Sequence, residues 1–567
     1  MFDKRCFDYI AFDGPYAIVE RTLSTEIGLL PDLSRGIEVS PSAITQLGLN
    51  AILNNHIEPS IKTEVGLVGS LSFGITPLAI CQIGLAPILQ RAIEVNPSLT
   101  TQIGLNAILK FLGIAEIKIW ISWDGTGNYD GEYDDITADV LSINIRRGRE
   151  SELGIAEIGT LEMILTDPDR KYSPENAESP LSPNVLPRRP VKVLASLGGA
   201  IQLFHGFIDK LICHPKLDEQ VTYLYAVDGM DYLSRVDVSS TLYKDLATGV
   251  LIGYILDDAG WDAVKRSIDT GDLIVPIGFW GGISALGAIR NLETSEVGAF
   301  AYINNEGEFV WEDANHRSGA ASVAIFENNY QGLKYEFGSK SIYNEIGIHM
   351  NKWELQPLAE IWRLEEEPTI GAGLSKTFWA NFEDIADSVT TPAATTDYTA
   401  FSGAGGTGDN HTADISIVTT KFAKGAKLVV TNGAGVTVYL NLLRLRGEIY
   451  DSQSTVTVKS EDATSQTAYQ KRTLSIESPF LTDMAKAQTY AAAALAKYKD
   501  PSPGVMLTIM SLPTGGGDQV IHRQISDKIR VINTRLGLDE YFFIEKIEYQ
   551  FTDGGTYQQA KWTLTKA

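Results

Sequence analysis

A repeat of very short period occupies residues 23–114 and constrains the fold more than any other feature of the chain. Its units begin with an apolar residue at Ile27 and recur in steps of ten or eight residues up to Ile103. Alternate copies read apolar-Gly-Leu and apolar-Glu/Thr-Val/Pro, so the true unit is a doublet of 18–20 residues. Every step is even, and successive side chains of a strand point to opposite faces, so each apolar position can face the same side. The repeat therefore predicts a stacked β array of about nine short segments.

Two roles remain open for this repeat. A single narrow array buries little surface, which favours an assembly element such as a spike, collar or plug, built with the same segment of neighbouring subunits. The alternative is an amphipathic helical segment that meets a membrane.

The stretch 115–235 carries the clearest strand signals. Ser142–Arg146 alternates apolar and polar residues, with Ile143 and Ile145 on one side, and Gly159–Leu165 repeats the pattern after a turn at Gly148. This period of two is typical of half-buried strands. Further strands are predicted at 191–194, 202–212 and 221–228.

Turn and loop chemistry separates these strands. Thr166-Asp167-Pro168-Asp169 is a strong turn, because Pro168 fixes φ and the Asp side chains can accept hydrogen bonds from nearby backbone N–H groups. Five prolines between Tyr172 and Pro190 then exclude regular structure and predict a long loop.

The order of these motifs resembles the minor tail or baseplate hub proteins of long-tailed bacteriophages. In that family a strand ending in R-R-G-R is followed by a D-x-D-R-x-Y/F-x-P turn. The residues of this chain that carry the resemblance, and that it makes candidates for family-motif or subunit contacts, are Arg146, Arg147, Arg149, Asp167, Asp169, Arg170 and Tyr172. Gly206-Phe207-Ile208-Asp209 and Asp228-Gly229 extend it, and weaker matches run through 236–370 and 445–567. The repeat at 23–114 has no counterpart in the family.

The resemblance implies a structural virion protein of the tail tip, assembled in the host cytoplasm, that closes the tail tube and anchors other tip and tube proteins. Such hubs are trimers, in which two similar domains per chain match the six-fold rings of the tube. DNA would pass through the lumen without specific binding, and no stable membrane insertion is expected.

The expected fold is mainly β and multidomain, with β-barrel or sandwich hub domains, a small α+β domain and the N-terminal β repeat. The predicted parts are an N-terminal arm at 1–22, the repeat at 23–114, a hub β domain at 115–235, an α+β domain at 236–335, a second hub β domain at 336–376 and 448–567, and an inserted β-sandwich at 377–447. Helices are predicted at 249–259, 282–294 and 482–499, the last capped by Thr482. Residues Tyr469–Arg472 match the family's Y-G-x-R except that Gln470 replaces the glycine, which puts the tight turn there in doubt.

Composition is that of a globular protein in a reducing compartment. The chain has 71 acidic and 47 basic residues, a net charge of −24, which argues against a nucleic-acid-binding surface. Three widely separated cysteines give no disulfide framework. The N-terminus lacks a signal-peptide pattern, and no apolar run is long enough for a membrane span.

No catalytic or metal-binding set emerges, so neither an enzyme nor a cofactor is predicted. The sequence has no G-x-S-x-G elbow, and its histidines and cysteines are scattered. The Arg146-Arg147-Arg149 cluster could bind phosphate, but pairing with Glu150, Glu152 or a neighbouring subunit is favoured; His316 and Arg317 are interpreted as surface polar residues. A second hypothesis is a tail-associated glycan-binding or cell-wall-degrading protein, with 377–447 as its carbohydrate module.

Overall fold

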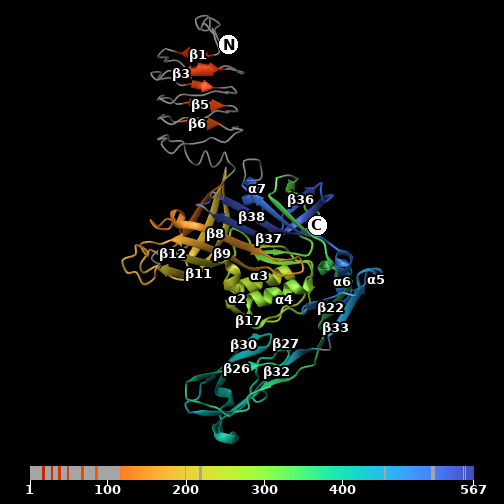
Figure 1. Cartoon of the computed structure of the whole chain (residues 1–567). Helices are drawn as coiled ribbons and strands as arrows, with labels where there is room; N and C mark the ends of the chain where they lie inside the picture. The colour runs from red at the N-terminus through yellow and green to blue at the C-terminus, as the bar shows by residue number, and fades with distance from the viewer. Residues whose placement is uncertain are drawn as a thin grey trace.

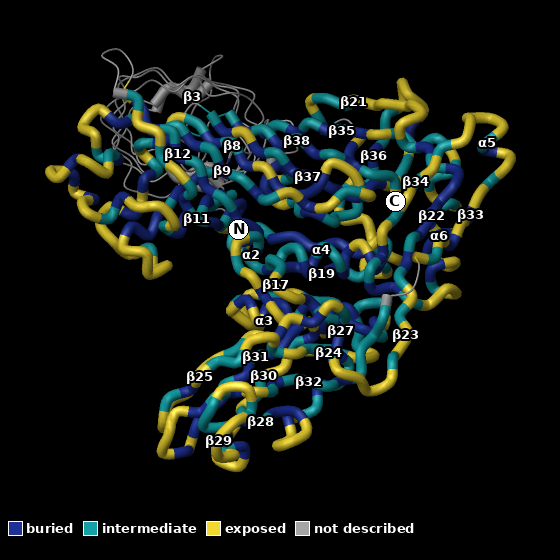
Figure 2. Tube along the Cα trace, turned by 90° about the horizontal axis from the view of Figure 1, so that it is seen from below, coloured by how far each residue is buried: buried dark blue, intermediate teal, exposed yellow. Residues whose placement is uncertain are grey.

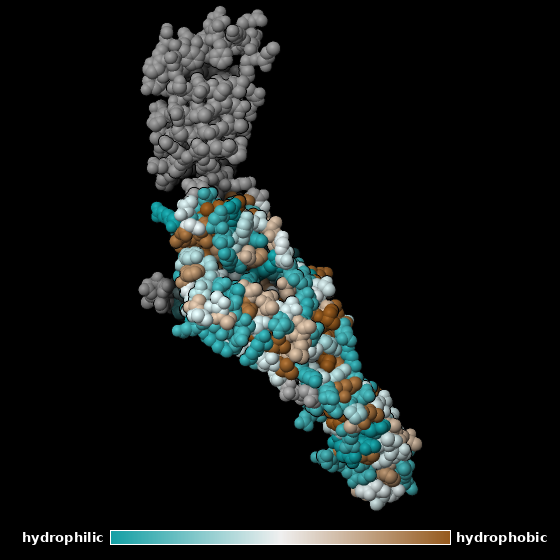
Figure 3. All heavy atoms as spheres, turned by 90° about the vertical axis from the view of Figure 1, so that its right-hand side faces the viewer, coloured by the Kyte–Doolittle hydropathy of each residue, from teal (hydrophilic) through white to brown (hydrophobic). Residues whose placement is uncertain are grey.

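The computed structural model describes residues 115–567 except 198, 216–219, 328, 453–454, 512–516, 553–554 and 556, together with the backbone of six short strands before residue 115. It is mainly β, as predicted. The described residues form an elongated body, with a large sheet at one end, helices in the middle and a smaller β module at the other end (Figures 1 and 3).

The repeat region contains parallel strands at the predicted spacing. The strands are β1 Tyr16–Val19, β2 Ile27–Leu29, β3 Gly36–Val39, β4 Leu47–Leu49, β5 Val65–Val68 and β6 Ile83–Ala86. Strands β2, β4, β5 and β6 stack in register, with Gly28 opposite Gly48 and Gly66 opposite Gly84, and β3 pairs with β1 in a separate sheet (Figure 1). The β prediction and the doublet period are thus confirmed for these strands. The copies that begin at Ile57, Ile75, Ile93 and Ile103 lie outside the described residues, as does most of the arm at 1–22.

A twelve-stranded sheet, called here the large sheet, combines the two ends of the described chain. Its main order is β21-β35-β38-β37-β8-β9-β12-β11-β10-β7, with β20 and β36 attached beside β37. The strands are β7 Glu116–Ile121, β8 Val140–Gly148, β9 Glu157–Thr166, β10 Pro190–Ser196, β11 Ala200–Pro215, β12 Gln220–Val227, β20 Ala324–Phe326, β21 Gly332–Glu336, β35 Gly504–Met510, β36 Lys528–Asn533, β37 Leu538–Thr552 and β38 Tyr557–Lys566. Every strand predicted between 142 and 228 is present.

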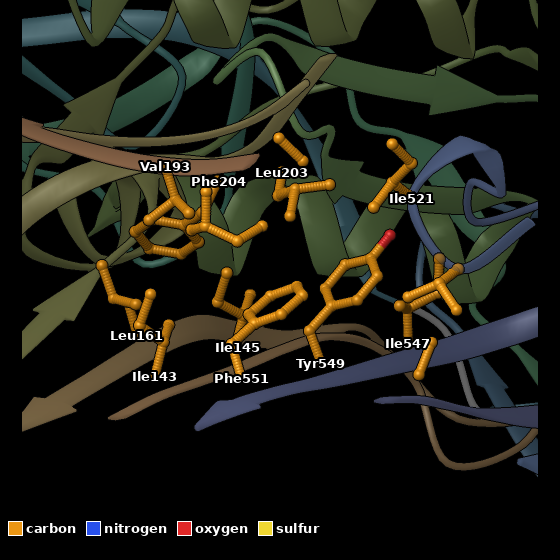
Figure 4. Close-up of a cluster of buried hydrophobic side chains, with 14 of the residues drawn as sticks. Ile143, Ile145, Leu161, Val193, Leu203, Phe204, Ile521, Ile547, Tyr549 and Phe551 are labelled. Atoms are coloured by element: carbon orange, nitrogen blue, oxygen red, sulfur yellow. The ribbon is translucent and has the colours of Figure 1, made fainter. Parts of the chain in front are cut away.

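One hydrophobic core serves both halves of the large sheet. Ile143 and Ile145 of β8 are buried on the face that the alternation predicted, beside Ile547 of β37. Figure 4 shows these side chains pointing toward Phe204 of β11 and Ile521 of the short helix α7 Gly517–His522. Residues more than 300 positions apart in sequence therefore share one core.

A helical unit packs beneath the large sheet. Its elements are α2 Gly229–Arg235, β13 Asp237–Ser239, β14 Leu246–Ala247, α3 Thr248–Asp258, β15 Arg266–Ile268, β16 Ile274–Val275, β17 Gly281–Ser284, α4 Ala285–Ser295, β18 Phe300–Ile303 and β19 Phe309–Glu312. In Figure 2, α4 and β19 run as largely buried segments between the large sheet and the smaller β module. Helices α3 and α4 and the β18–β19 hairpin match the predicted positions within a few residues, whereas α2 was not predicted.

A second core cluster joins this unit to a three-stranded sheet and the longest helix. The elements are β22 Glu345–Met350, β33 Val456–Glu461, α5 Ala463–Tyr469, β34 Thr473–Ser478 and α6 Met484–Tyr498. The cap of α6 differs from the prediction: the Asp483 carboxylate, not Thr482, accepts hydrogen bonds from Ala485 and Lys486 backbone N–H groups at 2.7 and 3.2 Å. A carboxylate at this position also complements the positive end of the helix dipole.

The smaller β module is built around one long strand. Its strands are β23 Trp353–Leu355, β24 Ala359–Arg363, β25 Thr369–Ile370, β26 Ser375–Asn381, β27 Ile385–Val389, β28 Tyr398–Gly403, β29 Thr407–Asn410, β30 Ile415–Phe422, β31 Gly425–Asn432 and β32 Val438–Ser452. β32 pairs with β23, β24, β25, β27 and β28, and a separate sheet in the order β26-β31-β30 packs with it around a third core. Strands β23–β25 belong to this module, so its sheet begins before residue 377.

Candidate functional site

The candidate motif residues divide into a buried and an exposed group. Arg147, Arg149, Asp167 and Tyr172 are buried within the chain, whereas Arg146, Asp169 and Arg170 are exposed. The buried four therefore act inside the protomer. A role in contacts between subunits stays a prediction for the three exposed residues.

The end of the R-R-G-R strand is joined to the C-terminal part of the chain. Strand β8 runs antiparallel to β37, with Arg147 opposite Ile547 and Gly148 opposite Lys546. Gly148 has a φ of +108°, and a Cβ placed there would lie 2.1 Å from the carbonyl oxygen of Glu545. Only glycine fits this close approach, after which the Arg149 backbone N–H donates to the same carbonyl at 2.9 Å.

Behind this turn lies a buried ion network centred on Glu545. The Arg149 Nε donates to Glu545 Oε2 at 2.6 Å, and their side chains are 2% and 0% exposed. Arg317 donates to the other carboxylate oxygen and, through Nε, to Ser526 Oγ at 3.0 Å. The Arg149 guanidinium also lies over the Phe300 ring, 3.8 Å from its centroid. Burial opposes ionisation of Glu545, but Arg149 and Arg317 together hold its pKa below the ordinary value.

This network corrects two expectations. Glu150 and Glu152 do not pair with the arginine cluster: Glu150 contacts Lys546, and Glu152 accepts from Lys497 at 2.5 Å. Arg317 is not a surface residue, since its side chain is only 14% exposed and contacts Glu545. His316 is exposed beside Asp269, in line with the surface interpretation. Sequence reasoning missed Glu545 because its partners are distant in the chain, although a charged Glu-Lys pair inside the apolar run Tyr541–Phe551 was a usable signal.

Arg147 lies at the same junction of β8 and β37. It is 3% exposed, and its Nη2 donates to Gln524 Oε1 at 3.3 Å. Near it, the buried carboxylate of Asp228 caps helix α2, accepting from Met230 and Gly159 backbone N–H groups at 2.9 and 2.8 Å. Burial raises the pKa of Asp228 to about 7. The D-G motif of the resemblance is thus a helix cap fixed against strand β9.

The D-x-D-R-x-Y turn is also held from inside. Asp167 accepts from Thr222 Oγ1 at 2.7 Å and from the Tyr172 backbone N–H at 3.3 Å. Tyr172 is fully buried, and its hydroxyl donates to Asp139 at 2.5 Å. Burial and then Asp139 raise the pKa of Tyr172. These residues fix the start of the proline-rich loop, which leaves Asp169 and Arg170 at its exposed tip.

A pocket of about 680 Å³ opens where the loop after β8 meets α4, β34 and α6. Its lining includes Arg149, Glu152, Glu293 and Tyr498. These charged groups already have partners: Tyr498 donates to Glu152 at 2.8 Å, and Glu293 pairs with Arg290 at 2.5 Å. These contacts tie the loop after β8 to α6 and hold Glu293 within α4 at the wall of the pocket.

Neither a metal-binding cluster nor a membrane-spanning helix is found in the described part of the chain. Among those residues, no group of three or more His, Cys, Asp or Glu side chains is placed to hold a metal ion. Nor does any helix there reach the length and apolarity needed to cross a membrane.

Comparison with known proteins gives structural neighbours only. No family model matches the chain, and no curated protein matches its sequence. Its structural neighbours include tail proteins and a component of the type VI secretion system from E. coli. The 43 kDa tail protein of prophage MuSo2 from Shewanella oneidensis is 13% identical, with a TM-score of 0.43, over 80% of this chain and 98% of that one. A tail protein from Neisseria meningitidis is 11% identical, with a TM-score of 0.44, over 80% and 96% of the two chains. The prophage tail protein gp18 from Listeria monocytogenes is 11% identical, with a TM-score of 0.38, over 79% and 94%. At these values, function has to be argued from the residues of this chain.

Proposed function

We propose that this chain is a structural protein of a phage tail tip, a baseplate hub or minor tail protein that closes the tail tube and anchors other tip proteins. The observation that carries the proposal is the pairing of the R-R-G-R strand β8 with β37 in one large sheet. The motif regions at the two ends of the described chain form one rigid unit, held by Gly148 and the Arg149–Glu545–Arg317 network. A continuous, stiff sheet suits a part that must extend a tube.

In this proposal three copies form a ring around the tube axis. Each chain supplies two β regions, so a trimer matches the six-fold rings of a tube. The net charge of −24 fits a lumen lined by carboxylates, because these repel the DNA phosphates and let DNA pass without specific binding. The assembled protein would reside in the virion, at the tail tip, without stable membrane insertion.

Strand β21 is the proposed contact with a second copy of the chain. At the opposite edge of the large sheet, β7 is covered, since Ile121 and Ile119 exchange backbone hydrogen bonds of 2.9 and 3.0 Å with residues 134–136. β21, by contrast, pairs only with β35 within the described residues. Tyr335 and Phe337 beside this open edge are 38% and 62% exposed, with ring centroids 6.4 Å apart and nearly parallel planes. An open edge with exposed aromatic residues offers unpaired backbone groups and apolar surface to which another chain can pair.

Two further parts of the chain, the exposed motif residues and the parallel strands of the repeat, are also proposed to contact neighbouring subunits. Arg146, Asp169 and Arg170 are proposed to contact neighbouring subunits, since they are exposed on motifs whose other members fix the local backbone. The parallel strands β2, β4, β5 and β6 are proposed to form an assembly element with the same segment of neighbouring copies.

The mass of the purified full chain in solution tests this assignment. We expect trimers, and Phe337→Lys should shift the mass toward monomers. Leu536→Lys is the matched control, because Leu536 is 52% exposed and lies in the turn between β36 and β37 rather than at the β21 edge. Monomeric wild-type protein, or equal effects of the two variants, would remove the support for β21 as a subunit contact.

A further inference from the structure

The three-stranded sheet β26-β31-β30 has one buried and one open face. The buried face carries Ala380, Ala426, Leu428 and Val430 into the core of the module. Because successive side chains of a strand point to opposite faces, the residues that alternate with these buried ones lie on the open face. The strand register aligns them in rows across the sheet, such as the row of Trp379, Lys427 and Thr420. The outward residues are Ser375, Thr377, Trp379, Asn381, Ser416, Val418, Thr420, Phe422, Lys427, Val429 and Thr431. We call this surface the β26–β30 face.

Two aromatic rings with nearly parallel planes lie next to each other on this face, and we call this pair the aromatic platform. Trp379 is 61% exposed, and its ring lies 6.3 Å from that of Phe422, with planes 22° apart. The strand between them, β31, has Gly425 next to Phe422 in the register, so no side chain separates the rings. A Cβ at Gly425 would lie 2.7 Å from the Ala380 carbonyl oxygen. Glycine is therefore required at position 425, and its lack of a side chain leaves room for the two rings to lie next to each other.

Polar groups of one kind surround the platform. The outward residues supply hydroxyls from Thr377, Thr420 and Ser416, with the Ser375 and Thr431 hydroxyls 2.7 Å apart. Lys427 Nζ lies 5.7 Å from the Trp379 ring centroid. The face carries no carboxylate, although the whole chain has 71 acidic residues. The β26–β30 face therefore combines aromatic rings, neutral hydrogen-bonding groups and one cation, in contrast to the acidic composition of the whole chain.

We propose that the β26–β30 face binds a polysaccharide chain of the bacterial surface, a function beyond that of a tail-tip structural part; the polysaccharide class follows from the face itself, whereas the bacterial source rests on the proposed function. The apolar face of a sugar ring stacks on an aromatic plane, while the hydroxyls at its rim bond to Ser, Thr and Asn side chains. The spacing of the two rings is comparable with the length of one sugar residue, so neighbouring sugars of an extended chain meet Trp379 and Phe422. Lys427 pairs with acidic substituents of the polymer, and the lack of carboxylates removes the repulsion that most of this protein's surface would exert.

The test uses the full chain and defined probes. These are bacterial sacculi with and without their attached wall polysaccharide, for co-sedimentation, and neutral xylan and acidic alginate, for affinity electrophoresis. We expect retention by at least one probe, and Trp379→Ala and Phe422→Ala should each weaken it about tenfold, as loss of one stacking contact predicts. Trp379→Phe should recover part of the affinity. Lys427→Ala should weaken binding to an acidic probe but not to a neutral one.

The control is Leu374→Ala, since Leu374 is 62% exposed in the same module but lies in the turn before β26. It should bind as the unchanged protein does. Absence of retention by every probe overturns the proposal, as does retention that Trp379→Ala leaves unchanged. If Trp379→Ala instead alters the mass of the protein in solution, the face is an interface between copies and the proposal is wrong.

Discussion

Neutralising Glu545 should loosen the junction of β8 and β37 more than any comparable change on the same strand. Glu545→Gln removes the negative charge that Arg149 and Arg317 share, and it leaves Arg317 with only the more distant carboxylate of Glu312 at 3.6 Å among its ion-pair partners in the described residues; the side chains of Arg149 and Arg317 are 2% and 14% exposed. Breaking a buried ion pair leaves a charge in a poorly solvated site, and the expected loss of stability is about 3–5 kcal/mol. Replacing these three residues by apolar ones together with the acid that also contacts Arg317 (Arg149→Met, Arg317→Met, Glu545→Leu, Glu312→Gln) should recover most of that loss.

The matched control is Asp539→Asn, also on β37. Asp539 binds Arg530 in a bidentate pair with two 2.7 Å hydrogen bonds, but both partners are exposed, and exposed pairs contribute little. The two variants thus remove the same charge from one strand in different surroundings.

Hydrogen exchange of the native protein, read by mass spectrometry on peptides from β8 and β37, measures the local effect. In Glu545→Gln the exchange of these peptides should accelerate about a hundredfold or more, the equivalent of about 3 kcal/mol. Exchange no faster than in Asp539→Asn would refute the claim that this network joins the two halves of the large sheet.

Three further predictions follow from single residues and one from the repeat. Burial, then Lys265 and Lys192, lower the pKa of His205 to about 4. The contribution of the neutral His205 to the unfolding free energy is therefore fully present above about pH 6.5 and is lost as pH falls through 4, by up to about 3 kcal/mol. Urea titrations at several pH values should show that this pH dependence of the unfolding free energy is absent in His205→Gln. Gln470 has φ +65° and ψ 163°, a region that favours glycine, so Gln470→Gly should raise the unfolding free energy by about 1 kcal/mol while Gln470→Ala does not. Gly148→Ala should lower the unfolding free energy by more than about 2 kcal/mol, because the alanine Cβ would meet the Glu545 carbonyl oxygen. An unchanged urea midpoint would contradict this prediction. Deleting residues 23–114 should leave the large sheet folded by circular dichroism but disturb tail-tip assembly; normal infectious tails would exclude the proposed role of the repeat.

Local signals in the sequence predicted most of the elements but few of the distant contacts. The alternation at 142–146 and 159–165 gave β8 and β9 with the right buried faces, because period two reports directly on a half-buried strand. The even steps of the repeat likewise indicated stacked strands. Helix α6 was evident from its composition, yet its cap was assigned to Thr482 when the neighbouring Asp483 makes the hydrogen bonds. Caps depend on backbone angles that composition does not report.

The candidate site shows where sequence reasoning ends. Arg149 was among the predicted motif residues, but Glu545 and Arg317, which it joins, come from other elements, and the pairing of β8 with β37 brings Glu545 beside it. The turn at Gln470 was in doubt for lack of a glycine. Gln470 nonetheless adopts a positive φ, and the buried Asn344 holds the backbone there, because it accepts from the Arg472 backbone N–H and donates to the Gln470 carbonyl, both at 2.8 Å. Such supports involve residues more than 100 positions apart, which no local pattern encodes.

The most direct test of the proposed function is the cryo-electron microscopy density of an intact tail, with this chain located in it. The account predicts three copies at the tip, arranged in a ring with the large sheets around an acidic lumen that continues the tube. Six copies, a basic channel, or a position away from the tube axis would contradict it.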